Sequence, residues 1–183
     1  MTIHLVLGGA RSGKSTHAEG LAKSQLLNAT HQDLKLHYVA TAQPFDDEMK
    51  MRIKHHQNKR GQQWQEHEVP IHLAKIVSGF NAKDVVLIDC LTLWLNNIIF
   101  HLGDNVTEQQ VQTEIDRLLS SLDETDATII LVSNEVGLGV VPLGEVSRLF
   151  VDHAGWMNQK IAVIASHVDF IAAGIALTLK PQK

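Results

Sequence analysis

Residues 3–15 read IHLVLGGARSGKS, and this stretch decides the fold of the chain. Its first five residues are an apolar run that stops at a pair of glycines, which is typical of a buried β-strand. Gly8, four further residues and then Gly13, Lys14 and Ser15 make the full phosphate-binding loop pattern, in the required place between a strand and a helix. A tight glycine turn without a ligand is the alternative, but the lysine and serine that follow the turn favour bound phosphate.

Each residue type in this loop suits the binding of phosphate or of its metal ion. Glycines let main-chain N–H groups curl around phosphate oxygens, and the helix expected over about 15–27 adds the positive end of its dipole. The Lys14 ammonium reaches the β- and γ-phosphates, and the Ser15 hydroxyl holds Mg²⁺. The pattern therefore predicts a site for a nucleoside triphosphate and Mg²⁺, made by Gly8, Gly9, Ala10, Arg11, Ser12, Gly13, Lys14 and Ser15.

Strand and helix patterns alternate outward from this loop. They predict strands over 34–40, 64–70, 84–89 and 127–133, and helices over about 46–59, 106–122 and 142–166. Thr107 and Gln110 make a capping box at the start of one helix, and a closing hairpin or edge pair is expected around Gly174.

This alternation predicts one α/β domain over residues 1–183. The expected class is the phosphate-loop NTPase fold of RecA-like type, with a mainly parallel sheet and helices on both of its faces. Ligands of such sheets lie at the carboxyl ends of the strands.

The composition limits the classes of binding partner and the cellular compartment that we expect for this chain. The chain has 183 residues, a formal net charge of −4 and 5% aromatic residues, which argues against nucleic acid as a partner. Its apolar stretches fall short of the ~20 residues that span a bilayer, so no membrane span is expected. A single cysteine and a start without a secretory pattern predict a cytoplasmic protein.

The strand expected over 84–89 ends at Asp89, and Cys90 follows it. Asp89 stands at its tip, where such folds hold the Mg²⁺ shell or another polar part of the nucleotide, although an N-cap of the following helix is an alternative. Cys90 is expected to be a small buried residue rather than a nucleophile, since no base is paired with it. The three tryptophans are expected in the core or an interface rather than against a bound ligand: Trp64, Trp94 and Trp156.

Six motifs in order resemble one family almost from end to end. They are GGARSGKSTHAE (8–19), YVATAQ (38–43), DDEMKMRIKHHQ (46–57), VVLIDCLTLWLNN (85–97), VSNEVGLGVVP (132–142) and DHAGWMNQ (152–159). The set resembles the bifunctional adenosylcobinamide kinase and adenosylcobinamide-phosphate guanylyltransferase family of cobalamin biosynthesis. The resemblance implies phosphorylation of the hydroxyl on the aminopropanol arm of adenosylcobinamide, with ATP or GTP as donor. It then implies transfer of GMP from GTP onto that phosphate through a guanylylated histidine, in a homotrimer.

The stretch RIKHHQNKRG (52–61) offers two histidines for the nucleophile. The family spacing from Arg52 selects His56, and helix geometry agrees, because Arg52, Lys59 and Arg60 share its face. These cations lower the pKa of the imidazole, keep it neutral and attract a triphosphate. The alternatives are a solvated basic face, a His56 that only contacts phosphate, or a metal held by His55 and His56, although adjacent helical side chains point about 100° apart.

The family also implies further nucleotide contacts. Glu68 is expected to accept hydrogen bonds from the N1 and N2 donors of guanine, whereas Asn134 and Glu135 are as consistent with a structural turn as with a functional role. The nucleotide contacts carried over are Ala40, Thr41, Ala42, Gln57, Asn58, Lys59, Arg60, Glu68 and Asp89.

Two other functions fit parts of the sequence. A plain small-molecule kinase of the same fold would leave the histidines passive. A nucleotide-binding regulatory or assembly ATPase would bind nucleotide without acting on a corrinoid, although the chain has no repeat or partner-binding tail that favours it.

Overall fold

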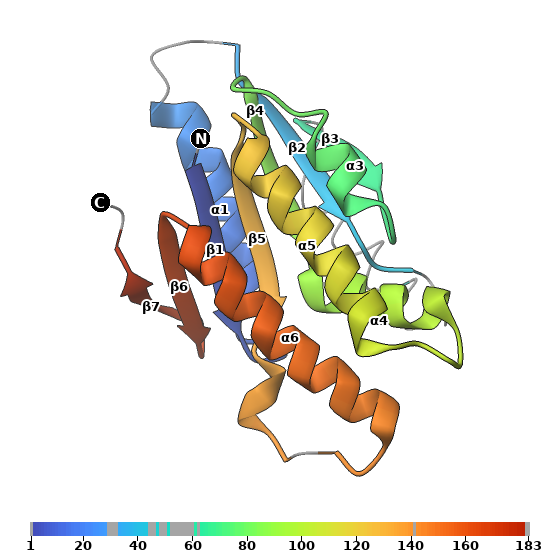
Figure 1. Ribbon diagram of the computed structural model, residues 1–183. Coiled ribbons are helices and arrows are strands. Elements are labelled where there is room, and N and C mark those ends of the chain that lie inside the picture. Colours follow the sequence, from blue (N-terminus) through green and yellow to red (C-terminus); the bar gives the residue numbers. More distant parts are fainter. Residues whose placement is uncertain are drawn as a thin grey trace.

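The computed structural model of this chain describes residues 2–28, 33–43, 47, 51, 61, 63–140 and 142–181 (Figure 1). In this part of the chain seven strands form one sheet in the order β3-β2-β4-β5-β1-β6-β7. All neighbours pair in parallel except β6 and β7, which are antiparallel. The strands are β1 (Thr2–Gly8), β2 (Lys35–Ala40), β3 (Trp64–Glu68), β4 (Asp84–Asp89), β5 (Thr128–Asn134), β6 (His167–Ala172) and β7 (Ile175–Lys180).

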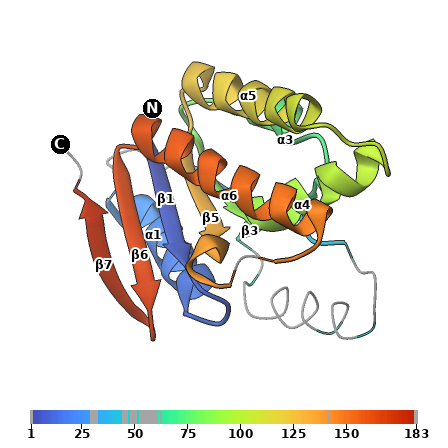
Figure 2. The ribbon, with the colours of Figure 1, turned by 60° about the horizontal axis from the view of Figure 1, so that its bottom comes forward.

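Helices cover both faces of the sheet, as Figure 2 shows with α1 on one side and α5 and α6 on the other. Parallel strands need this double cover, because crossover connections place helices on the faces and the strands become apolar throughout. The helices are α1 (Lys14–Asn28), α3 (Leu73–Val77), α4 (Leu91–Leu102), α5 (Glu108–Glu124) and α6 (Glu145–Ile164), with a 3₁₀ turn η1 (Val136–Leu138).

Side chains of successive strand residues enter two separate cores. Ile3, Leu5 and Leu7 of β1 pack under α4, α5 and α6, whereas Val6 packs with Ala18 of α1 on the opposite face. This is the two-residue period of a strand expressed in a sheet that is buried on both sides. It explains why the apolar runs in the sequence are continuous rather than alternating.

The predicted fold class and most of the predicted elements are confirmed. The strands expected at 34–40, 64–70, 84–89 and 127–133 are present, and so are the helices expected at 15–27, 106–122 and 142–166. Thr107 caps α5 in a complete capping box with Gln110. The helix expected over 46–59 lies outside the described residues, apart from Asp47 and Met51, which are both helical.

The closing hairpin is also confirmed. Strands β6 and β7 are joined by Ala173 and Gly174, whose φ angles are 51° and 79°. Two positive φ angles in a two-residue loop match the right-handed twist of the flanking strands. Apolar side chains of β7 remain exposed, namely Ile175, Leu177 and Leu179.

The carboxyl ends of the parallel strands meet at the lower edge of the sheet in Figure 1. Gly8 at the end of β1 pairs with Asn134 at the end of β5, and Ala40 at the end of β2 pairs with Asp89 at the end of β4. The predicted phosphate loop and Asp89 are therefore brought to the same edge by the register alone. Among the described residues, no helix has the length and apolar character to cross a membrane.

Candidate functional site

The phosphate loop leaves β1 at Gly8 and enters α1 at Lys14. A side chain at Gly8 would place its Cβ 2.6 Å from both the Ile171 carbonyl oxygen and the Ser12 hydroxyl, a separation that real Cβ atoms do not show. Gly13 has a φ of 98°, and its Cβ would lie 3.2 Å from the Cα of Gly174. These two positions require glycine because the loop runs close to β6 and to the hairpin turn.

Lys14 is buried, and its ammonium donates a hydrogen bond to the Gly9 carbonyl at 2.8 Å. The side chain therefore folds back along the loop that it follows. Lys14 is also the first residue of α1, and the first turn of that helix holds no acidic residue. A helix N-terminus, main-chain N–H groups and a buried lysine make a site suited to anionic phosphates.

Asp89 lies half-buried at the end of β4, and its Oδ2 accepts a hydrogen bond from the Tyr38 hydroxyl at 3.3 Å. The N-cap of α4 is Cys90, and no side chain caps that helix end. The alternative reading of Asp89 as a helix cap is therefore wrong: the carboxylate belongs to the strand end, one residue before the cap. It is left at the edge where ligands of such sheets bind.

The predicted Mg²⁺ ligands fit that ion by their chemistry. Ser15 offers a hydroxyl oxygen and Asp89 a carboxylate oxygen, and Mg²⁺ prefers hard oxygen ligands. Within the described ranges, no group of three or more histidine, cysteine, aspartate or glutamate side chains is placed to hold a metal.

Thr41 joins the end of β2 to the residue after β4. Its hydroxyl donates to the Cys90 carbonyl at 2.7 Å and accepts from the Cys90 N–H at 2.8 Å, and its own N–H donates to the Asp89 carbonyl at 3.2 Å. The residue is fully buried, at 0% exposure. Thr41 thus fixes where Asp89 lies, while Ala40 and Ala42 on either side of it are half-buried.

Asn97 of α4 extends this connection to the next loop. Its amide nitrogen donates to the Thr41 carbonyl at 2.8 Å and to the Pro70 carbonyl at 3.1 Å. Pro70 follows the edge strand β3, which carries the exposed Glu68. Asn97 therefore holds the segment after Glu68 and the segment after β2 together. Its place in a buried helix, at a position that periodicity alone reads as core, is why sequence reasoning missed it.

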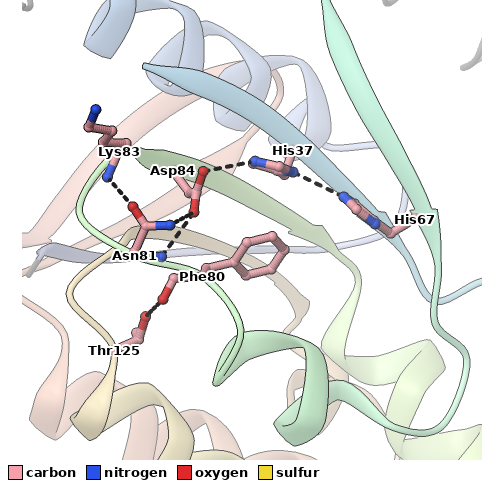
Figure 3. Close-up of polar contacts among 7 residues, drawn as sticks. All are labelled: His37, His67, Phe80, Asn81, Lys83, Asp84 and Thr125. Atoms are coloured by element: carbon pink, nitrogen blue, oxygen red, sulfur yellow. Dashed lines mark hydrogen bonds and ion pairs between the residues drawn. The ribbon is translucent and has the colours of Figure 1, made fainter. Parts of the chain in front are cut away.

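A buried polar network attaches the rest of β3, as Figure 3 shows for His37, His67 and Asp84. His37 donates through Nε2 to the Asp84 carboxylate at 3.1 Å, and its Nδ1 lies 3.0 Å from Nε2 of His67. Asp84 also accepts two hydrogen bonds from Asn81, at 2.9 and 2.8 Å. Because the carboxylate only accepts, it fixes the tautomer of His37, whose Nδ1 then accepts from His67.

The charge state of this network follows from its burial. Burial lowers the pKa of His67, and the neighbouring His37 lowers it further. A lowered pKa favours the neutral form of His67, whose Nε2–H can then donate to Nδ1 of His37. The network fixes the edge strand that carries Glu68.

Asn134 and Glu135 sit directly beside the phosphate loop. The Asn134 amide donates to the Thr92 hydroxyl at 2.9 Å, and the Glu135 N–H donates to the Gly8 carbonyl at 3.1 Å. Asn158 of α6, buried and not singled out from the sequence, donates to the Asn134 carbonyl at 3.3 Å and to Glu135 Oε2 at 3.4 Å. The structural-turn reading of this pair is thus supported by contacts that connect β5 to α4, α6 and the loop.

Comparison with known proteins decides the family. A family model described as cobinamide kinase / cobinamide phosphate guanyltransferase matches residues 4–179. The chain is 47% identical over 179 residues to the bifunctional adenosylcobalamin biosynthesis protein CobP of Pseudomonas aeruginosa, covering 97% of each chain. It is 38% identical over 188 residues to the CobU protein of Escherichia coli, covering 96% of this chain and 98% of that relative. This chain belongs to the cobinamide kinase / cobinamide phosphate guanyltransferase family.

The fold is shared more widely than the family. A KaiC-like protein from Pyrococcus horikoshii aligns with all of this chain and 80% of its own, at a TM-score of 0.53 and 14% identity. At that identity the likeness shows the fold alone. It agrees with the RecA-like class predicted from the phosphate loop and the alternating elements.

The family motif around residues 52–60 lies outside the described residues. The predicted nucleophile His56 and the predicted contacts Gln57, Asn58, Lys59 and Arg60 belong to it. A shallow hollow of about 400 Å³ elsewhere is lined by residues of the β3–α3 region and by none of the phosphate loop, so we do not assign it to the nucleotide. Its lining is Val69, His72, Lys75, Ile76, Gly79 and Phe80.

The expectations for the cysteine and two of the tryptophans are confirmed. Cys90 is buried, and its Sγ lies 3.2 Å from the Thr92 hydroxyl. Burial, with the nearby Asp89 charge, raises the pKa of the thiol to about 11. Trp64 and Trp94 are buried in the two cores, whereas Trp156 on α6 is 45% exposed.

We expect the Cys90 thiol to be inert in the native family member. At pH 8 the native chain should react with iodoacetamide far more slowly than the chain unfolded in urea, and its reactivity should rise only as the pH approaches 11, because only the thiolate attacks. Since the chain has one cysteine, alkylation counted by mass spectrometry reports this residue alone. Equal rates for native and unfolded chains at pH 8 would contradict the burial argument.

Proposed function

We propose that this chain phosphorylates adenosylcobinamide, with ATP or GTP as donor, and then transfers GMP from GTP to the new phosphate to give adenosylcobinamide-GDP. The observation that carries the proposal is the match of the family model over residues 4–179. The phosphate loop between β1 and α1 supports it with the anion site that both reactions need. We further propose that the chain acts as one domain in a cytoplasmic homotrimer, in line with the family.

In the kinase reaction the loop holds the triphosphate. Main-chain N–H groups of the loop and the N-terminus of α1 bind phosphate oxygens, and the Lys14 ammonium contacts the β- and γ-phosphates. The residues that would hold Mg²⁺ are Ser15 and Asp89, and the ion when bound would neutralise charge on the phosphate oxygens. The hydroxyl of the corrinoid arm attacks the γ-phosphorus, and the nucleoside diphosphate leaves.

In the second reaction a neutral His56 attacks the α-phosphorus of GTP, and the P–O bond to pyrophosphate breaks. The phosphate of the corrinoid then attacks the phosphoramidate, takes the GMP and releases the imidazole. The cations Arg52, Lys59 and Arg60, at helical spacing from His56, support this role by lowering its pKa and by attracting the triphosphate.

The remaining contacts are proposed by position. Glu68, exposed on the edge strand, accepts hydrogen bonds from guanine. Thr41 contributes through the place it gives Asp89 and through its half-buried neighbours Ala40 and Ala42, because its own polar groups already bond to the protein. The contacts after the nucleophile are Gln57, Asn58, Lys59 and Arg60.

Replacing Lys14 with alanine should lower kcat/KM about 100- to 1,000-fold in both reactions, since one preorganised charge is removed from phosphates that gain charge in both transition states. Steady-state kinetics with cobinamide and with cobinamide phosphate measure this. Lys23→Ala on the same helix is the matched control and should leave both rates unchanged. Full kinase turnover by Lys14→Ala would overturn the assignment of a shared loop.

Replacing Asp89 with asparagine should weaken Mg²⁺-dependent turnover about 10- to 100-fold and leave the fold intact, because the neutral amide is a poor ligand for a hard cation. A Mg²⁺ titration of turnover is the measurement, with circular dichroism as the check on folding. Tyr38→Phe keeps the carboxylate and loses only its hydrogen bond, so its effect should be much smaller. An unchanged Mg²⁺ titration for Asp89→Asn would remove the residue from the metal site.

Replacing His56 with alanine should abolish covalent capture of GMP and guanylyl transfer while sparing much of the kinase, which needs the loop and Mg²⁺ but no protein nucleophile. The measurement is acid-labile label from α-labelled GTP on each variant, beside a cobinamide phosphorylation assay. His55→Ala is the matched control and should keep the label. Loss of label from His55→Ala alone would identify the other imidazole, and retention by both variants would favour the plain kinase.

A further inference from the structure

The hairpin of β6 and β7 is in direct contact with the phosphate loop. The Gly174 N–H in its turn donates to the Ser12 carbonyl at 2.8 Å. Gly13 faces the Cα of Gly174 so closely that a Cβ on Gly13 would lie 3.2 Å from it. At the start of the loop, Gly8 lies against the Ile171 carbonyl of β6. The loop backbone therefore packs against β6 and its turn at both of these glycines.

A buried carboxylate connects the same hairpin to the helix that follows the loop. Asp169 of β6 is 3% exposed, and its Oδ2 accepts a hydrogen bond from Nε2 of His17 in α1 at 3.0 Å. Its Oδ1 accepts from the Thr178 hydroxyl of β7 at 2.8 Å and from Nε2 of His167 at 3.1 Å. Asp169 thus joins β6, β7 and α1 through both of its oxygens.

Asp169 remains ionised in this setting. Burial alone would raise the pKa of the carboxyl, but the hydrogen bonds from His17 and Thr178 and the nearby His167 outweigh it and lower the pKa below its ordinary value. A carboxylate only accepts hydrogen bonds, so the Nε2–H of His17 is the donor. The bond therefore fixes the orientation of the His17 ring as well as its distance from Asp169.

The position of His17 makes this bond relevant to phosphate. His17 lies one helical turn after Lys14, and its N–H donates to the Gly13 carbonyl at 3.0 Å. Its side chain bonds to Asp169 of the hairpin, so this bond connects the first turn of α1 to β6. The first turn supplies the N–H groups and the dipole end that bind anions, and these interactions fall off within that turn.

Hydrophobic packing does not explain why an acid is buried at position 169. The β7 side chains Ile175, Leu177 and Leu179 are exposed, and a carboxylate in a buried position costs free energy that an apolar residue would not. What the acid provides is a fixed geometry among three elements, two of which touch the loop.

We propose that the β6–β7 hairpin is part of the nucleotide site, with Asp169, acting through His17, as a positioning residue for the phosphate loop and for Lys14. The proposal rests on the proposed function only in that the loop binds nucleotide. It names no contact between the hairpin and the corrinoid. Because the loop binds the triphosphate, which ATP and GTP have in common, weakening this connection lowers the affinity for both nucleotides.

The test compares two replacements of His17. Leucine removes the donor, whereas glutamine keeps an N–H that reaches the Asp169 carboxylate. The probes are N-methylanthraniloyl derivatives of ATP and GTP, titrated with Mg²⁺ and without corrinoid, so the result does not depend on the corrinoid substrate. We expect His17→Leu to weaken binding of both nucleotides about tenfold, because small displacements in a binding site are costly. His17→Gln should recover most of that loss.

Lys180→Met is the matched control for stability. Lys180 attaches β7 to α6 by donating to the Ala162 and Val163 carbonyls, at 3.0 Å each, and does not touch the loop. This variant should lower the urea midpoint of unfolding and leave nucleotide affinity unchanged. Unchanged affinity in His17→Leu would overturn the proposal, and so would an equal loss in His17→Leu and His17→Gln. A loss of affinity in Lys180→Met as large as in His17→Leu would also overturn it, since general loosening would then explain both.

Discussion

The phosphate loop passes so close to β6 and its turn that Gly8 and Gly13 leave no room for a side chain, and much of the site follows from that packing. A Cβ at Gly8 would lie 2.6 Å from the Ile171 carbonyl, and one at Gly13 would lie 3.2 Å from Gly174. The loop backbone is therefore fixed by its neighbours as well as by its own sequence. Its N–H groups are thereby kept in one arrangement rather than ordered by the ligand, which lowers the entropic cost of binding phosphate.

A second layer of buried polar bonds fixes the strand ends around the loop. Thr41 joins β2 to the residue after β4, and Asn134 with Asn158 joins β5 to α4 and α6. In a buried setting each such bond is expensive to leave unmade, so the set holds one geometry. The residues proposed to face the ligand, such as Asp89, are thus separate from the residues that place them.

The sequence predicted the elements well because their signals are local. The apolar run before Gly8 is made by neighbouring residues, and so is the capping box at Thr107. The structure confirms both elements. The contacts that position the site are not local: His17 and Asp169 are 152 positions apart, and His37 meets Asp84 across 47. Nothing in the period or composition of a strand reveals which distant partner a buried histidine or aspartate will meet. The role of Asp89 is ambiguous in the sequence because the exact start of the next helix is not evident there. The structure places the N-cap at Cys90, one residue later, so Asp89 is not the cap.

The two proposed reactions attack different phosphorus atoms, yet they ask the same thing of the loop. Transfer of the γ-phosphoryl group leaves charge on the β-phosphate, and transfer of GMP leaves charge on pyrophosphate, which is the β- and γ-phosphates together. In both cases the groups that gain charge are those that Lys14 and the N-terminus of α1 are proposed to contact. A single rigid anion site therefore stabilises both transition states, and only the attacking group has to differ: a corrinoid hydroxyl in one reaction and a protein imidazole in the other. In this proposal the kinase and the nucleotidyltransferase reactions of one small α/β chain share the phosphate loop as their anion site.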